Sequence, residues 1–518
     1  MALSGSQRAA IRHPFKWLWE KEAGNPGEIP RKELTCYTLG LMGQNHLYGM
    51  AGGNRFFHFC TNVLMLNPTT VGTLTGATSV FDAFNDPVAG SIIDNYRFKD
   101  GRKLLPWIKR TSPFIAVLAF LLFVNWNLPS YALRVLYCTV IYVLWDIFYS
   151  FQDAALWGMT AAIHPGSGQR ARATQWADIG AFLGGLLPGL TMPMLSGSGA
   201  FGMTQQQIYL LFAVFMCLGG GFQSLFALGM TERVRSLPSL VNPDENAREK
   251  GQNQNFRAIW QNISCLRHNY ILLLFLASEV LRSCTPNVAD IYIFQQMTYQ
   301  VGSRAVAAPV VIMIVTIFTG MPGSFLKFFA TKIFERVGGM KRLIIIARFA
   351  SLCARILTWA IGIRTLPMLI LGYVVDSIAG LPGNIDNIAM RAMISDSVEY
   401  VEWKTGHRTE GITMSIRNLM AKLTGAIGSY IQGHSLRFLQ FDARLVEQNL
   451  PQNAHFHQWG WTIFRLGPAF GIVMSLIPLL LLKYPDSLKF QIEEEMKERR
   501  AMAEAKKIAE ELALTVEL

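Results

Sequence analysis

Apolar runs of about 20 residues recur along this chain, and they restrict its fold more than any other feature. A helix needs about 20 apolar residues to cross the roughly 30 Å of hydrocarbon in a bilayer. Only 16% of the 518 residues are charged, whereas about 25% are charged in an average soluble protein. We count twelve such runs, centred between residues 48 and 472. The sequence therefore predicts an all-α membrane protein with twelve transmembrane helices.

Positive charge is distributed unevenly between the connections of these predicted spans. Lys and Arg are concentrated in the N-terminal tail and in the loops after even-numbered spans, as in RFKDGRKLLPWIKR (97–110). Loops after odd-numbered spans contain few, such as Arg134 and Arg364. This bias follows the positive-inside rule and predicts that both termini are cytoplasmic. The net charge of +12 therefore indicates contact with anionic membrane lipid, and we expect no nucleic-acid partner.

A polar stretch near the middle of the chain divides the predicted spans into two groups of six. Transporters built from two related bundles show this organisation. We expect a multi-pass protein of the cell (plasma or inner) membrane with five parts: a cytoplasmic tail (1–34), a six-helix bundle with the cation site (35–230), a cytoplasmic middle loop (231–264), a second six-helix bundle (265–485) and a cytoplasmic helical tail (486–518).

The second predicted span carries two carboxylates in the stretch FDAFNDPVAG. Asp82, Asn85 and Asp86 share one helix face because their spacing is i, i+3 and i+4. Two carboxylates this close repel each other unless a proton or a cation neutralises them. Pro87 has no N–H, so the carbonyl of Ala83 loses its helical partner and becomes a further candidate oxygen ligand. The pattern predicts a cation site for Na⁺ or H⁺, with Na⁺ at Asp82 and Asp86; the alternative is that each Asp caps or pairs with a neighbouring helix.

The fourth predicted span contains the stretch DIFYSFQDAALW. Tyr149, Asp153 and Trp157 follow one another at intervals of four residues, and Ser150 lies beside them. An acid that accepts hydrogen bonds beside aromatic rings suits a sugar, which presents hydroxyl groups around apolar C–H faces. The alternative is that the aromatic side chains only pack between helices.

Two basic residues of the second half carry a predicted coupling or gating role. Lys422 lies within the apolar part of the eleventh span and needs an anionic partner. That partner is either the carboxylate pair of the second span or, locally, Asp376. Arg408 belongs to a cluster of charged residues, SDSVEYVEWKTGHRTEG (395–411), at the inner ends of spans ten and eleven. We interpret this cluster as a salt-bridge gate.

Together, the motifs FDAFNDPVAG, QDAALWGMT and EYVEWKTGHRTEG resemble the glycoside–pentoside–hexuronide:cation symporters of the major facilitator superfamily. The resemblance covers roughly residues 35–485 and implies the major facilitator fold and cation-coupled symport. The stretch GSIIDNYRFKDGRK (90–103) also looks like the conserved loop between spans two and three of that superfamily. We therefore expect Asp94 and Arg102 to act in coupling or gating.

The resemblance also implies roles for individual residues. It places Asp82, Asn85 and Asp86 on the family's cation-site positions, with Ser150 where a threonine hydroxyl normally helps. It likewise assigns residues of the fourth span to the sugar and one residue of the eleventh span to coupling: Tyr149, Asp153, Trp157 and Lys422.

The predicted substrate site departs from the family pattern at three positions. Asn45 follows Gln44 where the family's type member has a Lys–Asp pair whose Asp contacts sugar. Asp178 stands where that protein has a functional arginine, and Asn387 where it has a tryptophan. We assign Asn45, Asp178 and Asn387 to a remodelled substrate site.

The sequence thus predicts a symporter that works by alternating access and carries a glycoside, oligosaccharide or hexuronide with Na⁺ or H⁺. No cofactor other than the coupling ion is expected. We expect no enzymatic activity, since the sequence lacks HExxH, GxSxG and any His cluster in the spans. The alternatives are a non-sugar cargo, such as a lipid-like or other organic solute, and a sensor that binds ligand without transporting it.

Overall fold

The computed structural model of this protein describes most of the chain between residues 28 and 498. The described ranges are 28–96, 102–164, 167–189, 203–233, 269–326, 339–405 and 410–482, with single positions between and after them. Most of the predicted N-terminal tail, middle loop and C-terminal tail lies outside these ranges. The chain forms two compact units, described separately below. Unit 1 comprises Met1–Val241, Ala289–Met313 and Gln432–Phe456, and unit 2 comprises Asn242–Val288, Ile314–Ile431 and His457–Leu518.

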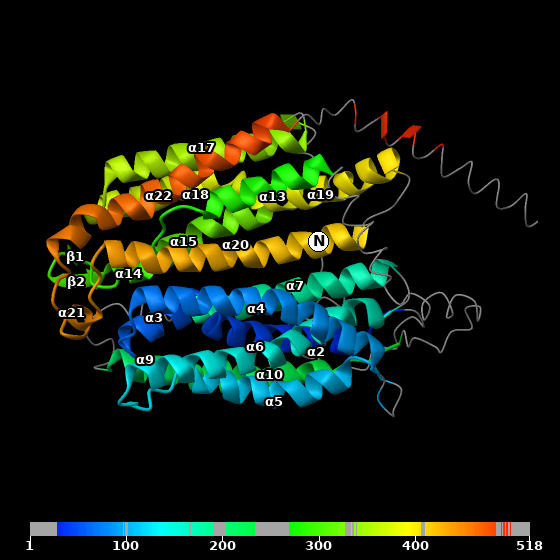
Figure 1. The fold of residues 1–518 in the computed structure, drawn as a ribbon, viewed down its shortest axis with the longest axis horizontal. Helices are drawn as coiled ribbons and strands as arrows, with labels where there is room; N and C mark the ends of the chain where they lie inside the picture. Colours follow the sequence, from blue (N-terminus) through cyan, green and yellow to red (C-terminus); the bar gives the residue numbers. More distant parts are fainter. Residues whose placement is uncertain are drawn as a thin grey trace, which may run out of the picture. The chain divides into compact units, whose positions relative to one another are not determined.

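Unit 1 contains long helices from the first half of the chain and short elements from the second (Figure 1). Its helices from the first half are α2 (Arg31–Ala51), α3 (Asn54–Asn62), α4 (Pro68–Asn95), α5 (Leu105–Leu121), α6 (Tyr131–Ala162), α7 (Ser167–Gly189) and α9 (Gln205–Phe212), which continues through a π-helical turn, η3 (Ala213–Leu218), into α10 (Gly219–Ser224) and η4 (Leu225–Gly229). The later elements are α14 (Asp290–Phe294), β1 (Thr298–Val301), β2 (Arg304–Ala307) and α21 (Ala443–Glu447).

Unit 2 is built from the remaining helices of the second half (Figure 1). They are α13 (Tyr270–Ser283), α15 (Ala308–Leu326), α17 (Met340–Ile361), α18 (Leu366–Gly380), α19 (Gly383–Thr405), α20 (Glu410–Phe438) and α22 (Ala454–Leu481). The first residues of α15 and of α22 and the last residues of α20 belong to unit 1.

The described residues include a short β-hairpin, which was not expected from the sequence. Strands β1 and β2 pair antiparallel, with Val301 opposite Arg304. Gly302 between them has a φ of 62°, a conformation that glycine adopts without steric cost. This hairpin is too short to change the helical character of the fold.

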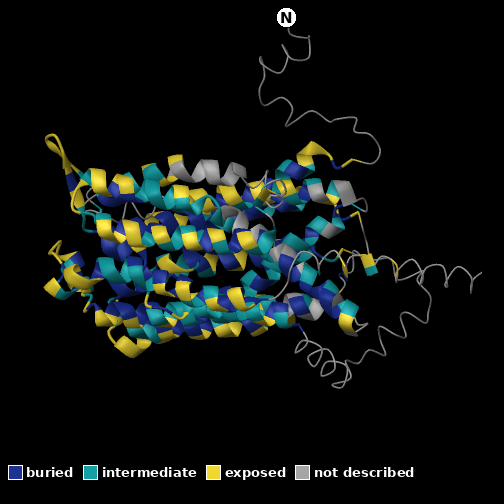
Figure 2. Cartoon of the chain, turned by 90° about the horizontal axis from the view of Figure 1, so that it is seen from above, coloured by how far each residue is buried: buried dark blue, intermediate teal, exposed yellow. Residues whose placement is uncertain are grey.

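Four helical segments of the described residues are long and apolar enough to cross a membrane: Tyr131–Thr160, Gln205–Gly229, Met340–Ile361 and Ala454–Leu481. Helix α4 is 28 residues long and α20 is 29 residues long, but both carry more polar side chains. Large apolar side chains are exposed along the helices, as Figure 2 shows by burial class, and Phe84 is 65% exposed. Such exposed apolar surface is what lipid hydrocarbon contacts.

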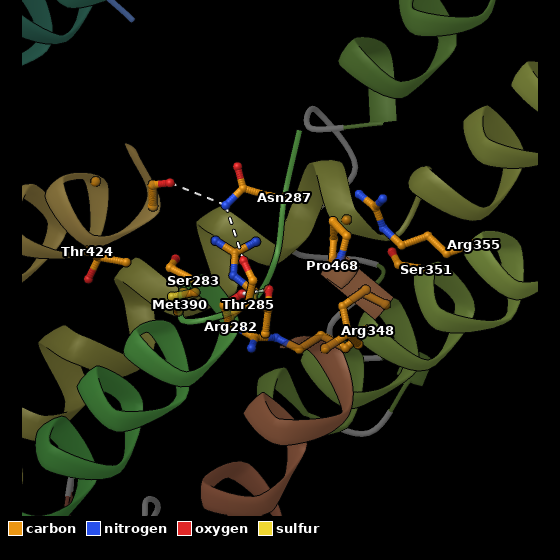
Figure 3. A pocket seen from close by; sticks show the side chains of 15 residues that line it. Arg282, Ser283, Thr285, Asn287, Arg348, Ser351, Arg355, Met390, Thr424 and Pro468 are labelled. Atoms are coloured by element: carbon orange, nitrogen blue, oxygen red, sulfur yellow. Dashed lines mark hydrogen bonds between the residues drawn. The ribbon is translucent and has the colours of Figure 1, made fainter. Parts of the chain in front are cut away.

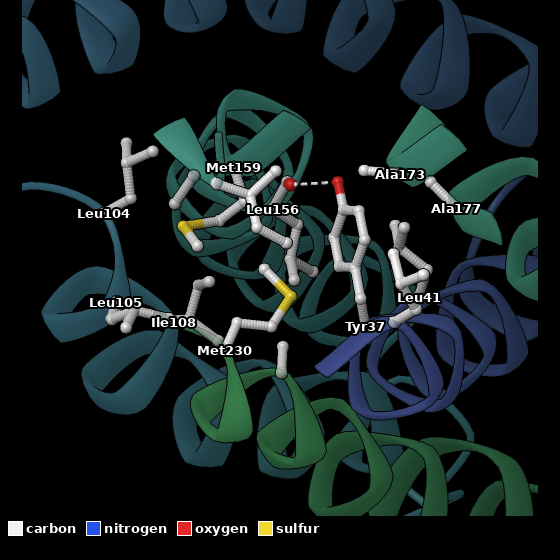
Figure 4. Packing of buried hydrophobic residues seen from close by; sticks show 14 of the residues in the cluster. Tyr37, Leu41, Leu104, Leu105, Ile108, Leu156, Met159, Ala173, Ala177 and Met230 are labelled. Atoms are coloured by element: carbon white, nitrogen blue, oxygen red, sulfur yellow. Dashed lines mark hydrogen bonds between the residues drawn. The ribbon is translucent and has the colours of Figure 1, made fainter. Parts of the chain in front are cut away.

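Helix α2 lies at the centre of the packing in unit 1, where it contacts α7 and α10. Small residues allow this close approach. A Cβ atom added at Gly180 would overlap the carbonyl oxygen of Thr38, and one added at Gly184 would overlap that of Met42. The Tyr37 hydroxyl donates to the carbonyl oxygen of Leu156 at 2.7 Å, within a fully buried apolar cluster (Figure 4).

The core of unit 2 includes a residue from the predicted C-terminal tail. Ile492 is 1% exposed and belongs to the buried cluster that contains Leu343, Val401 and Leu482. The indole N–H of Trp403 donates to the Glu495 carboxylate at 2.6 Å. These described positions of the tail therefore pack against unit 2.

Replacing Ile492 with alanine is expected to destabilise unit 2 by about 2–4 kcal/mol, since the change leaves a cavity in a closed apolar cluster. The melting temperature of the purified protein in detergent would fall. Glu494→Ala is the matched control, because Glu494 is exposed two residues away. Equal melting temperatures for the two variants would contradict the packing role of Ile492.

Candidate functional site

The predicted cation residues lie on α4 away from its exposed apolar side. Asp82 is half-buried and Asp86 is exposed. The most exposed apolar side chains nearby are Phe84, at 65%, and Val88, at 57%. Each is two residues from Asp86, so at 100° per residue each points about 160° away from it. The carboxylates therefore do not lie on the face that presents apolar side chains outward.

A hydrogen bond joins α4 to α6 beside these carboxylates. The Asn85 amide Nδ2 donates to Ser150 Oγ at 2.9 Å and lies 3.4 Å from the carbonyl oxygen of Asp146. The Ser150 hydroxyl in turn donates to that same carbonyl oxygen at 3.1 Å. Asn85 and Ser150, both predicted for the cation site, are thus brought together.

One further carboxylate of unit 1, Asp146, lies near this contact. Asp146 is only 5% exposed on α6, and Asp82 and Asp146 both interact electrostatically with the Tyr142 hydroxyl. Asp82 also interacts electrostatically with the Tyr149 hydroxyl. The side of α4 that carries Asp82 therefore faces the polar stretch of α6.

Asp153 occupies the centre of a second polar group between α2 and α6. Gln44 Nε2 donates to Asp153 Oδ1 at 2.8 Å. The Tyr149 hydroxyl lies 3.4 Å from the same oxygen. Tyr149 and Asp153, predicted as neighbours in a substrate site, are in contact through this long hydrogen bond.

Aromatic rings form a continuous row beside Asp153. Tyr48 from α2 stacks on Tyr149 with ring centroids 5.2 Å apart, and Trp145 stacks on Tyr149 at the same centroid distance. Tyr48 remains 48% exposed, so one face of the row is accessible. Stacked rings beside a carboxylate can bind the apolar face of a sugar while the acid accepts its hydroxyl hydrogen bonds.

Gln44 and Tyr48 were not predicted as site residues, although their spacing in the sequence places them on one helix face. They are four residues apart on α2 and therefore share a face. Gln44 was noted only as the neighbour of Asn45. In the structure Asn45 Nδ2 donates to the carbonyl oxygen of Leu41, one turn earlier in its own helix, at 2.9 Å.

The other predicted substrate residues of unit 1 lie around the edge of this group. Trp157 packs against the buried apolar cluster around Tyr37 and Leu156. Asp178 is exposed on α7 and, like Asp153, interacts electrostatically with the Tyr37 hydroxyl.

The remaining predicted positions lie on other elements or outside the described residues. The side chains of Asp94 and Asn387, and residue Arg408, lie outside the described part of the structure. Arg102 is exposed before α5. Lys422 is half-buried on α20 of unit 2. The local partner considered for Lys422, Asp376, forms an ion pair with Arg465 of α22.

The geometry of unit 1 thus combines a carboxylate, amide and hydroxyl group on α4 and α6 with an acid–aromatic group about one turn further along α6. Oxygen ligands of the first kind suit hard cations. The second kind suits a polyhydroxylated solute. No exposed nucleophile–base pair was identified among these residues.

Sequence comparison identifies related proteins over nearly the whole chain. A model of the family described as MFS/sugar transport protein matches residues 36–486. The chain is 25% identical over 438 residues to a raffinose carrier protein of Pediococcus pentosaceus, covering 81% of this chain and 62% of that protein, which is less than two thirds of the relative's length. It is 22% identical to an isoprimeverose transporter of Lactiplantibacillus pentosus, covering 88% and 89% of the two chains. It is also 27% identical to a provisionally named 2,3-dihydroxypropane-1-sulfonate exporter of Escherichia coli (strain K12), covering 79% and 84%.

Structural comparison relates the fold to solved membrane transporters. A crystal structure of a mutant form of the nucleoside transporter NupG superposes with a TM-score of 0.52 at 13% identity, covering 87% of this chain and all of that one. At this identity the likeness concerns the fold alone. These related proteins are carriers, transporters and an exporter, and none is an enzyme.

Proposed function

Because this chain belongs to the MFS/sugar transport protein family, we propose that it is a secondary transporter that carries a glycoside, oligosaccharide or hexuronide together with Na⁺ or H⁺. The sugars named for its relatives support this class of cargo. We further propose twelve spans, cytoplasmic termini and a location in the cell membrane, which the distribution of basic residues supports.

The observation that carries the proposal is the contact between α4 and α6. Asn85 donates to Ser150 at 2.9 Å on the same side of α4 as Asp82. A cation between the Asp82 and Asp86 carboxylates would reduce their mutual repulsion, and the amide and hydroxyl oxygens of Asn85 and Ser150 are hard ligands for Na⁺. A proton on one carboxylate would serve the same electrostatic purpose.

The cargo would bind against the second polar group. Asp153 accepts hydrogen bonds from sugar hydroxyls in place of, or beside, those from Gln44 and Tyr149. Tyr48 offers its exposed ring to the apolar face of the sugar. Ser150 and Asp153 lie on the same helix, which offers a route by which ion binding can affect the cargo site. If the ion raises the affinity for the cargo, linkage requires that the cargo raise the affinity for the ion by the same factor.

Uptake into proteoliposomes tests this function. Raffinose, lactose and isoprimeverose, each radiolabelled, are offered with an imposed Na⁺ gradient, with a proton gradient, and with neither. Accumulation driven by one gradient supports cation-coupled transport and identifies the ion. Accumulation that is the same in the presence and absence of both gradients would reject coupling.

Replacing Asp153 with asparagine is expected to weaken sugar binding by about tenfold to a hundredfold, because hydrogen bonds to a charged group contribute about 1.5–3 kcal/mol. Cation affinity should change less. Asn45→Ala serves as the comparison, since Asn45 donates within its own helix, and a smaller effect is expected. The binding of labelled sugar to each purified variant measures the two effects. An equal loss of affinity in the two variants would indicate that Asn45 also belongs to the substrate site.

A non-sugar cargo is the second candidate, and one relative favours it. The protein of Escherichia coli (strain K12) is named for a small dihydroxylated sulfonate. Uptake of that compound, with no uptake of any sugar, would select this alternative.

A further inference from the structure

Unit 2 contains a cavity of about 540 Å³, within the size range of small-molecule sites. Figure 3 shows that Arg282 from α13 and Arg348, Ser351 and Arg355 from α17 surround it. The three α17 residues are spaced i, i+3 and i+7, so they share one helix face. The described residues that line the cavity include three arginines and no Asp or Glu.

One carboxylate forms ion pairs with two of these arginines. Glu279 of α13 pairs with Arg282 at 2.8 Å and with Arg348 at 2.6 Å. Arg348 is only 4% exposed, and its Nε atom is buried without a hydrogen-bond partner among the described residues. Two guanidinium groups therefore share one acid, and one of them keeps a buried donor unused.

The third arginine has no acid of its own in the described part of the structure. Arg355 forms no ion pair there, and Asp376, the acid that attracts it, is already paired with Arg465. Arg282 and Arg465 are close enough to Arg355 to repel it. Among the described side chains, these four arginines pair with or are attracted by only two carboxylates, Glu279 and Asp376, so positive charge is in excess in this part of the structure.

Ionisable side chains within membrane-spanning helices are costly and usually mark a functional site. Of the three arginines that line the cavity, Arg348 is buried, Arg355 is half-buried and Arg282 is exposed. A guanidinium group is a planar fork that matches the two oxygens of a carboxylate or sulfonate. The hydroxyl groups of Ser351 and Thr424 add hydrogen-bonding capacity for a polyhydroxylated molecule. A neutral sugar would leave the excess charge uncompensated.

We propose that this cavity binds the anionic group, a carboxylate or sulfonate, of a small polyhydroxylated solute, with Arg355 as its principal ligand. The inference rests on the proposed transport of a small polar solute and narrows the cargo to acidic members of that class. The competing explanation is structural: Arg348 ties α17 to α13, and Arg465 ties α22 to α18. Arg355 forms neither of these connections, so substituting Arg355 distinguishes the two explanations.

Direct binding to purified protein in phosphatidylcholine nanodiscs, which contain no anionic lipid, tests the proposal. The probes are three matched pairs: D-galacturonate with D-galactose, D-glucuronate with D-glucose, and 2,3-dihydroxypropane-1-sulfonate with glycerol. We expect at least one anion to bind about tenfold or more tightly than its neutral partner. Arg355→Gln should remove that preference, and Arg355→Lys should retain part of it. Arg364→Gln, an exposed change in the same unit, should leave it intact.

Three results would overturn the proposal: no preference for any anion in the unsubstituted protein, an unchanged preference in Arg355→Gln, or failure of all three anions to bind. The gradient-driven uptake assay reports separately on transport. A protein that accumulates neutral sugars without preferring anions would keep its proposed function and lose only this anion site.

Discussion

Replacing Asp82 with asparagine is expected to abolish cation-driven uptake while the protein still folds and inserts. The amide keeps the shape of the carboxylate but removes its charge, and with it most of the attraction for the ion. Two unit charges about 4 Å apart interact by about 4 kcal/mol at the effective dielectric of a protein surface. We therefore expect cation affinity to fall by about a hundredfold or more. Asp86→Asn should have the same effect, because in the proposed site both carboxylates bind the ion.

The measurement is Na⁺ binding by calorimetry, together with uptake under an imposed gradient, for each variant in the same membrane preparation. Glu447→Gln is the control, since Glu447 is an exposed acid of unit 1 on α21. Unchanged Na⁺-stimulated uptake in both Asp variants would contradict the assignment of the cation site to α4. Loss in only one of them would point to a single carboxylate that exchanges a proton.

A single methyl group at Gly180 is expected to destabilise unit 1. The added Cβ would overlap the Thr38 carbonyl oxygen of α2, and neither backbone can yield without separating the two helices. Overpacking of this kind costs about 1–3 kcal/mol or more. We expect Gly180→Ala to yield little monodisperse protein after extraction and to melt several degrees lower.

Helix α7 contains its own control for this experiment. Gly185 lies in the same helix, but an added Cβ there meets nothing within 4 Å. Gly185→Ala should therefore leave stability unchanged or raise it by up to about 1 kcal/mol, because alanine favours a helix over glycine. Fluorescence-detected size-exclusion profiles compare the two variants. If both behave alike, close approach of α2 and α7 is not what Gly180 provides.

Local spacing was sufficient to predict part of the candidate site. Asp82, Asn85 and Asp86 fall on one face of a helix wherever that helix is placed, so their grouping needed no tertiary information. Contacts within α6, such as Tyr149 with Asp153, follow from the same periodicity. The family resemblance assigns Asn85 and Ser150 to one site, and in the structure their side chains lie 2.9 Å apart.

Partners from distant segments could not be predicted in this way. Gln44 reaches Asp153 across 109 positions of sequence, and only the packing of α2 against its neighbours determines which α2 side chain makes that contact. The arginines around the unit 2 cavity are also isolated in the sequence. Their excess charge becomes visible only when α13 and α17 place them around one space.

The hydrogen bond from Asn85 to Ser150 lies three residues from Asp153 along α6, a rigid rod over that distance. If Ser150 contacts the coupling ion and Asp153 binds the cargo, as proposed, an ion of a different size that displaces Ser150 also displaces Asp153. Ionic radius would then influence which solutes bind, and in a sodium-coupled protein the exchange of sodium for lithium would alter the selectivity for solutes as well as the rate.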